Sequence, residues 1–164
     1  MKQFTVFRAG EEEFGIDIQR VVEILNPVRR YMIPDMPDFL SGVINLRGTV
    51  IPVIDVQKRF HITSRPERER IIIVWVSRQM VGLTVDSVRE ITGFTDDEII
   101  APPPLFKGFK PEYLVGLGKK EDRVVILLNT DSILTAEEKI ELIESGKKME
   151  MSLDHESAKT PEER

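Results

Sequence analysis

The sequence predicts a mainly β fold made of two small β-barrel subdomains in pseudo-repeat, with short helical turns and one C-terminal helix. Three observations support this fold class. A pattern of glycine and aliphatic residues occurs twice along the 164-residue chain, short apolar runs are separated by turns rich in Gly and Pro, and helical periodicity is confined to a few segments. The length suits one domain, or two small subdomains that share an interior.

The internal repeat relates the two halves of the chain at an offset of 67 residues. Gly15, Val21, Glu23 and Ile24 are followed at that spacing by the same residue types, at Gly82, Val88, Glu90 and Ile91. Beyond residue 100 the offset rises to 74, which indicates that the second half contains a longer, Pro-rich loop. Chance similarity between β-rich segments is the alternative explanation of the match.

The repeat sets the expected domain boundaries. Its two copies place the subdomains near residues 2–62 and 69–134, with the polar segment 63–69 between them. A C-terminal helix is expected near 135–145. Residues 146–164 contain few large aliphatic side chains and many charged ones, so we expect an acidic, disordered tail.

Strands are predicted where short apolar runs are bounded by turn residues. The runs 43–46 and 50–54 flank Arg47, Gly48 and Thr49, as in a tight hairpin whose turn uses glycine. Pro52 lies inside the second run and cannot donate a ladder hydrogen bond, so we expect an edge strand or a bulge there. Residues 71–76 are apolar throughout, which predicts a strand buried on both faces.

Helical periodicity is confined to three segments. The first is a short turn capped by Asp17 and ended by Pro27, whose apolar positions are Ile18, Val21, Val22 and Leu25. Its counterpart in the second copy spans residues 85–91. The C-terminal helix begins with a capping box, in which Thr135 precedes Glu138 by three residues. It should pack on the barrels through an apolar stripe formed by Ile133, Ala136, Ile140 and Ile143.

Composition and charge exclude several classes of function. The net charge of -5 and the pI of about 5.2 argue against attraction of the whole protein to nucleic acid or to an anionic membrane. The chain has no cysteine, which excludes disulfides, thiolate metal sites and thiol nucleophiles. No apolar run approaches the roughly 20 residues of a membrane span, and the first residues lack a signal-peptide pattern. We therefore expect a cytoplasmic protein without direct membrane insertion.

The sequence offers few residues for catalysis. His61 follows a predicted strand and His155 lies in the tail, and neither has a recognisable nucleophile motif nearby. Asp55 and Asp86 end strand-like runs and suit structural caps; a hydrolase or transferase that uses both carboxylates is the alternative. We therefore predict no catalytic residue, no metal site and no cofactor.

Several apolar residues of the repeat have no obvious place in a small barrel. Val21, Ile24, Val88 and Ile91 either belong to the core or line a groove between the subdomains that would bind an amphipathic helix. Arg47 lies in an otherwise apolar hairpin, where it is either an ordinary solvated charge or an exposed anchor for a protein partner. The pattern alone leaves both choices open.

Five segments of the chain carry a likeness to one known family. They are residues 13–18, residues 42–48 with the sequence Asn-Leu-Arg-Gly, residues 51–55 with Pro-Val-Ile-Asp, residues 81–86, and residues 112–118. These segments resemble the CheW family of bacterial chemotaxis coupling proteins. The likeness covers about residues 3–145, so we expect a CheW-like domain over 1–145, and the acidic tail lies outside the family pattern.

The resemblance implies a fold, a function and a set of partners. It implies two SH3-like, five-stranded β-barrels and a non-enzymatic adaptor, or scaffold. Such an adaptor would couple the cytoplasmic tips of methyl-accepting chemoreceptors to the regulatory domain of a CheA-type histidine kinase, in receptor arrays at the inner face of the membrane. A CheW-like adaptor of a chemosensory-like pathway that controls pili, development or second messengers is the alternative.

The resemblance also implies which residues bind. Carried over by position, the receptor-binding residues would be Arg47, Gly48, Val21, Glu23, Val88 and Ile91. The sequence identifies no kinase-binding residue.

Overall fold

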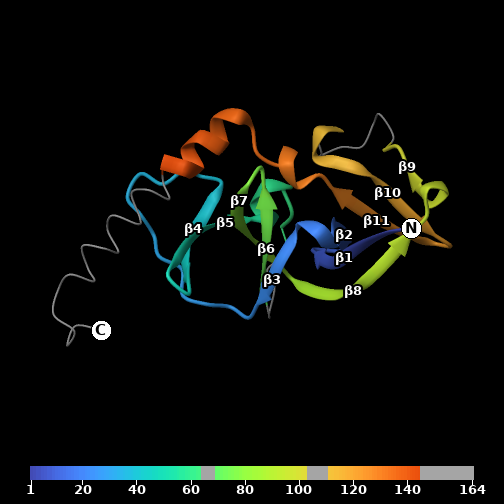
Figure 1. The fold of residues 1–164 in the computed structure, drawn as a ribbon, viewed down its shortest axis with the longest axis horizontal. Coiled ribbons are helices and arrows are strands. Elements are labelled where there is room, and N and C mark those ends of the chain that lie inside the picture. Colours follow the sequence, from blue (N-terminus) through green and yellow to red (C-terminus); the bar gives the residue numbers. More distant parts are fainter. Residues whose placement is uncertain (64–68, 103–110, 145–164) are drawn as a thin grey trace.

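A computed structural model describes residues 1–63, 69–102 and 111–144. In these residues eleven strands form two sheets (Figure 1). The strands are β1 (Lys2–Ala9), β2 (Glu12–Asp17), β3 (Val21–Leu25), β4 (Leu40–Leu46), β5 (Thr49–Asp55), β6 (Arg70–Val76), β7 (Gln79–Val85), β8 (Ser87–Phe94), β9 (Ile99–Ile100), β10 (Leu114–Lys120) and β11 (Arg123–Leu128). The expected tail at 146–164 lies outside the described residues, as do most of the polar segment 63–69 and of the Pro-rich loop.

In the described residues, helical structure is limited to short elements and one C-terminal helix, which confirms the predicted mainly β class. The short elements are η1 (Ile18–Arg20), α1 (Val56–Arg59), η2 (Asp96–Glu98), η3 (Pro111–Tyr113) and η4 (Thr130–Ser132). The C-terminal helix occupies residues 136–144.

The two sheets have matching topologies. The larger has the strand order β8-β1-β2-β11-β10-β9, and the smaller has the order β3-β6-β7-β5-β4. Each contains one parallel pair, β2 with β11 in the larger and β5 with β7 in the smaller. The smaller sheet has the five strands that were predicted. The larger has a sixth, because the two-residue strand β9 pairs with β10.

Each sheet contains strands from both copies of the repeat. The larger combines β1 and β2 of the first copy with strands of the second, and the smaller combines β6 and β7 of the second copy with β3, β4 and β5 of the first. The division between the sheets therefore does not coincide with the division between residues 2–62 and 69–134. Asp86 is the single residue between β7 and β8. A tight hairpin needs two loop residues, so β8 continues into the other sheet instead of folding back.

The two predicted helical turns are strands, apart from the three-residue turn η1. Asp17 caps η1 as predicted, because its side chain accepts a hydrogen bond from the backbone N of Gln19 at 2.9 Å. Residues 21–25 then form β3, with alternating half-buried and exposed side chains, and the equivalent residues of the second copy belong to β8. The helical prediction is wrong there because Val and Ile favour strands and because β6 and β1 offer edges to pair with.

The apolar interior has three parts, one inside each curved sheet and one between the sheets. The larger sheet curves around Phe4, Val6, Phe94, Val125 and Leu127. The smaller sheet curves around Ile44, Ile51, Val53, Ile71 and Ile73. The third part, the central cluster, joins the sheets through residues that include Phe7, Phe14, Ile16, Ile72, Val74 and Leu83. As predicted, β6 is buried on both faces except at the exposed Trp75, because its residues alternate between the smaller barrel and the central cluster.

The paired glycines of the repeat lie at crowded points of the two barrels. A Cβ atom at Gly15 would lie 2.9 Å from Leu127 Cδ2, and one at Gly82 would lie 3.0 Å from Ile71 Cγ2. Both neighbours belong to a barrel core. Glycine therefore lets the strands approach at equivalent points of the two barrels.

Pro52 does not lie on an edge strand, but the predicted alternative, a bulge, has a counterpart in the register shift of the β4–β5 ladder between Leu40 and Gly42. Its strand, β5, lies between β7 and β4. The described parallel ladder with β7 begins where Val53 faces Gly82, one residue after Pro52. The ladder with β7 therefore does not use the position that lacks an N–H group.

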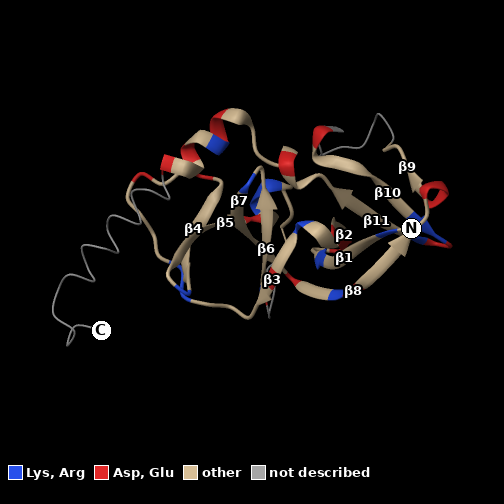
Figure 2. Cartoon of the chain, viewed as in Figure 1, with Lys and Arg blue, Asp and Glu red and all other residues tan. Residues whose placement is uncertain are grey.

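The C-terminal helix crosses the top of the molecule in Figure 1, and Figure 2 shows acidic residues along it among uncharged ones. The predicted capping box is present, since Thr135 Oγ1 accepts a hydrogen bond from the Glu138 backbone N at 3.1 Å and the Glu138 carboxylate accepts one from the Thr135 backbone N at 2.9 Å. The predicted apolar stripe is wrong beyond Ile133, because Ala136, Ile140 and Ile143 are all exposed. Leu142 is fully buried, whereas Ile140 is 58% exposed and Ile143 is 45% exposed.

An arginine determines which side of this helix faces the protein. Arg59, at the end of α1, donates hydrogen bonds to both carboxylate oxygens of Glu138 and to the backbone carbonyl of Ile133. Its guanidinium also lies 5.9 Å from the ring centroid of Phe39 and 5.8 Å from that of Tyr113. The helix therefore turns its Glu138 side inward, and the isoleucines are left outside.

Acid should loosen the attachment of this helix. Burial raises the pKa of Glu138, but the hydrogen bonds from Arg59 and Thr135 outweigh burial and hold the pKa below the ordinary 4.5. A carboxylate with a lowered pKa stabilises the fold above its unfolded pKa, and this contribution is lost as the pH falls through the folded pKa. Urea unfolding between about pH 7 and pH 3 should show a larger loss of stability for the wild type than for Glu138→Gln. Equal losses in both proteins would contradict the prediction.

Candidate functional site

The predicted hairpin is present, and its turn consists of Arg47 and Gly48 between β4 and β5. Both residues have positive φ, 50° for Arg47 and 88° for Gly48, which is typical of the two-residue turn that best fits twisted strands. The backbone N of Gly48 donates a hydrogen bond of 2.9 Å to Asn45 Oδ1. The turn is thereby held in one conformation, and the Arg47 side chain at its tip is 71% exposed.

Arg47 forms an ion pair with Glu23, another of the residues predicted to bind a receptor. Its Nη1 lies 3.3 Å from Glu23 Oε1, and its Nη2 lies 2.5 Å from Glu23 Oε2. The hydrogen bond from Arg47 lowers the pKa of Glu23, and the positive charge of Arg47 adds to this effect against the opposing effect of burial. Both groups are therefore charged near neutral pH. An exposed pair of this kind contributes little to stability, so its charges are available for recognition.

The second copy of the repeat contains a corresponding ion pair. Glu90 is the counterpart of Glu23, and its Oε1 lies 2.7 Å from Arg123 Nη1, at the start of β11. Arg123 also bonds Glu13 of β2, so it joins strands of the larger sheet. The side chain of Arg123 is 34% exposed, against 71% for Arg47. The two barrels therefore share an edge-strand glutamate bonded to a hairpin arginine. The arginine is the more exposed partner in the first pair, whereas Glu90, 52% exposed, is the more exposed partner in the second.

The predicted apolar site residues divide into two groups. Val21 and Val88 are partly buried against the same central cluster, which brings the beginnings of β3 and β8 to one core. Their side chains therefore contribute more to the packing of that core than to an exposed binding surface. Ile91 is 62% exposed on β8, an edge strand of the larger sheet. No described hydrogen bond or ion pair connects it to Arg47.

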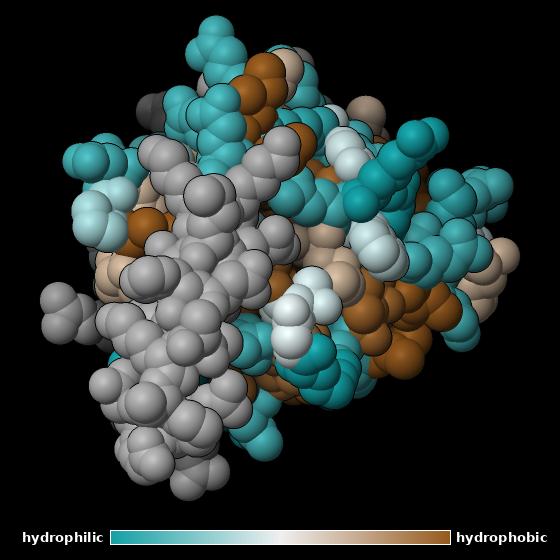
Figure 3. Space-filling model, turned by 60° about the vertical axis from the view of Figure 1, so that its left-hand side comes forward, coloured by the Kyte–Doolittle hydropathy of each residue, from teal (hydrophilic) through white to brown (hydrophobic). Residues whose placement is uncertain are grey.

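Two exposed apolar residues on β3 lie next to the predicted ones. Val22 is 42% exposed and Ile24 is 43% exposed, and they flank Glu23 on the edge of the smaller sheet. Val22 is not among the predicted site residues, because helical spacing assigned it to a buried turn. Ile24 is among the residues that the sequence offered for a groove, and an alternation of period two over residues 21–25 would have identified Val22 as well. Figure 3 shows hydrophobic side chains exposed in patches among hydrophilic ones on the face drawn there.

The residues of the catalytic alternative have structural partners. Asp55 caps α1 by accepting a hydrogen bond from the backbone N of Lys58 at 3.1 Å. Asp86 accepts hydrogen bonds from the backbone N of Gly10, at 2.8 Å, and from Gln57 Nε2, at 2.5 Å. His61 is exposed. These bonds fit the structural role that the sequence suggested for both aspartates.

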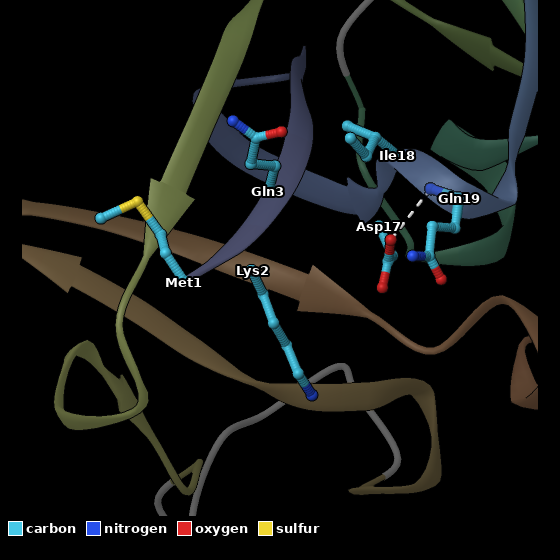
Figure 4. Close-up of a pocket in the computed structure, with 6 residues that line it drawn as sticks. All are labelled: Met1, Lys2, Gln3, Asp17, Ile18 and Gln19. Atoms are coloured by element: carbon cyan, nitrogen blue, oxygen red, sulfur yellow. Dashed lines mark hydrogen bonds between the residues drawn. The ribbon is translucent and has the colours of Figure 1, made fainter.

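A pocket of about 240 Å³ lies beside the passage from β2 to β3 (Figure 4). Six residues line it, namely Met1, Lys2, Gln3, Asp17, Ile18 and Gln19. They include one carboxylate, which caps η1, and therefore no pair of carboxylates for acid–base chemistry. Across the described ranges, no group of three or more His, Asp or Glu residues is placed to hold a metal ion. No helix in the described part of the chain is long and apolar enough to cross a membrane.

Comparison with known proteins agrees with this architecture. A family model described as a CheW-like domain matches residues 3–138. Chemotaxis protein CheW of Klebsiella aerogenes is 35% identical over 139 residues, with 84% of each chain covered. Protein FrzA of Myxococcus xanthus is 27% identical over 140 residues, covering 81% of this chain and 85% of FrzA.

A solved structure gives the same result for the fold. The crystal structure of the scaffolding protein TtCheW from Thermoanaerobacter tengcongensis matches with a TM-score of 0.76 and 37% identity, covering 82% of this chain and 88% of that one. Its two SH3-like subdomains correspond to the two curved sheets. With its two curved sheets, its Asn-Leu-Arg-Gly hairpin and these relatives, the chain belongs to the CheW family of chemotaxis proteins.

Proposed function

We propose that this protein is a non-enzymatic cytoplasmic adaptor that couples the cytoplasmic tips of chemoreceptors to a CheA-type histidine kinase. Family membership supports an adaptor of chemotaxis, and the relative described as a scaffolding protein supports a role without chemistry. The observation that carries the proposal is the exposed Glu23–Arg47 pair on a fixed turn beside the apolar edge strand β3.

The receptor-binding residues have different parts in this proposal. Arg47 and Glu23 present fixed charges, and Gly48 allows the turn that holds Arg47 in place. Ile91 offers apolar surface on β8, and Val22 and Ile24 offer apolar surface on β3. Val21 and Val88 would contribute indirectly, because they pack the two edge strands β3 and β8 against the central cluster and so hold these strands in position. A helical receptor tip fits such a surface, since amphipathic helices combine an apolar stripe with flanking charges.

The adaptor would transmit a signal without changing a covalent bond. A receptor can alter kinase activity through the adaptor only if it contacts the adaptor differently in its two signalling states. The central cluster joins the two sheets into one packed unit. Displacement of the whole adaptor against its partners is therefore the mechanism that we propose, because sliding one sheet over the other would disrupt that packing.

Co-purification tests this function. The full chain should bind both a cytoplasmic receptor fragment and a CheA-type kinase from the same organism, and it should increase recovery of the kinase with the fragment. Kinase autophosphorylation in the three-component mixture should depend on the adaptor. Folded protein that binds neither partner would overturn the proposal.

A second candidate is an adaptor of a chemosensory-like pathway with another output, such as pili, development or second messengers. The similarity to protein FrzA of Myxococcus xanthus supports this second candidate. Deletion of the gene distinguishes the two candidates. Loss of directed swimming in a gradient supports the chemotaxis adaptor, whereas normal swimming with altered pili or development supports the second.

A further inference from the structure

Trp75 is the only tryptophan of the chain, and it is 39% exposed near the end of β6. It pairs across the β6–β7 hairpin with Met80, which is itself only partly buried. Tryptophan gains more from burial than most side chains, and exposed aromatic surface that adjoins other apolar surface marks sites of interaction.

Trp75 lies between the core of the smaller barrel and the solvent. Side chains two residues apart share a face of a strand, so Trp75 lies on the same face of β6 as Ile71 and Ile73. Both isoleucines belong to the barrel core. Leu46 and Met80 are partly buried against that core as well. We refer to Leu46, Trp75 and Met80 as the barrel mouth.

The Glu23–Arg47 pair adjoins the barrel mouth. Glu23 faces Ile73 across the β3–β6 pair, and Trp75 follows Ile73 by two residues, roughly 7 Å along the strand. Arg47 directly follows Leu46 and bonds Glu23. A single partner segment that covers the ion pair would therefore also cover Trp75.

We propose that the barrel mouth binds an apolar side chain of an amphipathic helix that also carries a carboxylate, about one turn away, for Arg47. This inference rests on the proposed function, since the helix would belong to the receptor tip. Charge and position support this occupant. Arg47 uses two of its five N–H donors on Glu23, and its side chain remains 71% exposed. Trp and Arg are among the residue types that most often dominate binding energy at an interface.

Tryptophan fluorescence of this protein reports the burial of Trp75 alone, because the chain contains no other tryptophan. The full chain would be titrated with a tryptophan-free cytoplasmic fragment of a chemoreceptor from the same organism. Emission and acrylamide quenching would be recorded while calorimetry measures affinity independently. We expect a blue shift of the emission and weaker quenching as the fragment saturates the adaptor.

Substitutions provide a second readout. Trp75→Ser should weaken fragment binding roughly 30-fold or more, and Trp75→Phe should weaken it less, because phenylalanine retains part of the apolar contact. Val124→Ala is the matched control, since Val124 is a 46% exposed strand residue of the other sheet. It should leave fragment affinity unchanged.

Three other results would overturn the barrel-mouth inference, and each can be distinguished from the others. Binding seen by calorimetry without any change in tryptophan emission would overturn the barrel-mouth inference and leave the proposed function standing. Failure of the folded protein to bind the fragment would overturn both. Emission that is already blue-shifted without the fragment, and that depends on protein concentration, would instead assign the barrel mouth to a second copy of this chain.

Discussion

Replacing Arg47 with glutamate should weaken receptor binding by at least about 30-fold while the fold remains intact. The substitution removes the guanidinium that we propose contacts the receptor and places a second carboxylate beside Glu23. The fold should survive because the side chain is exposed and the turn depends on backbone conformation and on Asn45. Calorimetry with a receptor fragment measures the affinity, and circular dichroism checks the fold. Unchanged affinity would make Arg47 an ordinary solvated charge.

A charge exchange distinguishes two roles of Arg47. In the double variant Glu23→Arg/Arg47→Glu the ion pair can form in reversed order, whereas the charge offered to the receptor is inverted. If Arg47 contacts the receptor, the double variant should bind as weakly as Arg47→Glu alone. Recovery to within about twofold of the wild type would instead mean that the pair only fixes the hairpin against β3. Kinase binding should change little in both variants.

Replacing Phe14 with alanine should destabilise the whole protein by about 3–5 kcal/mol. Phe14 is fully buried in the central cluster. Its ring stacks on Phe7 at a centroid distance of 5.5 Å and on Phe60 at 5.6 Å, and so it links the larger sheet to the segment that follows α1. The lost contacts and the cavity both contribute to the cost. Urea denaturation followed by circular dichroism measures it.

The same experiment tests whether the two sheets unfold together. Because the central cluster contains residues of both sheets, Phe14→Ala should shift a single cooperative transition and should not release one barrel alone. Val124→Ala should change the free energy of unfolding by less than about 0.5 kcal/mol, since Val124 is half exposed at a sheet surface. Two separate transitions in the Phe14 variant would show that the barrels are independent.

Local sequence patterns predicted the elements whose structure depends on neighbouring residues. The hairpin at Arg47 and Gly48 was predictable because two apolar runs flank a turn that uses glycine. The capping box at Thr135 and Glu138 was predictable because both partners lie within one helical turn. The pairing of Arg47 with Glu23 was not, because it joins residues 24 positions apart through the packing of β3.

Where local patterns were compatible with more than one structure, tertiary contacts determined which structure formed. Residues 21–25 satisfy both a helical spacing and an alternation of period two, and the free edge of β6 selected the strand. In the C-terminal helix, the apolar stripe predicted that Ile140 faces inward. Arg59 holds Glu138 inward instead, so Leu142 is buried and Ile140 is exposed. Neither outcome follows from the segment alone, because each depends on a partner far along the chain.

The sequence by itself determined that the chain is β-rich, repeats itself and carries a CheW-type hairpin, since these properties lie in composition, spacing and short motifs. Only the tertiary structure decided that the two copies exchange strands, because the chain crosses from one sheet to the other at η1 and again at the one-residue connection Asp86, and neither crossing is specified by the local pattern. It alone also decided which apolar residues reach the surface. Exposure depends on how whole sheets curve and pack, and so Val21 and Val88 lie against the core while Trp75, Val22 and Ile91 face solvent.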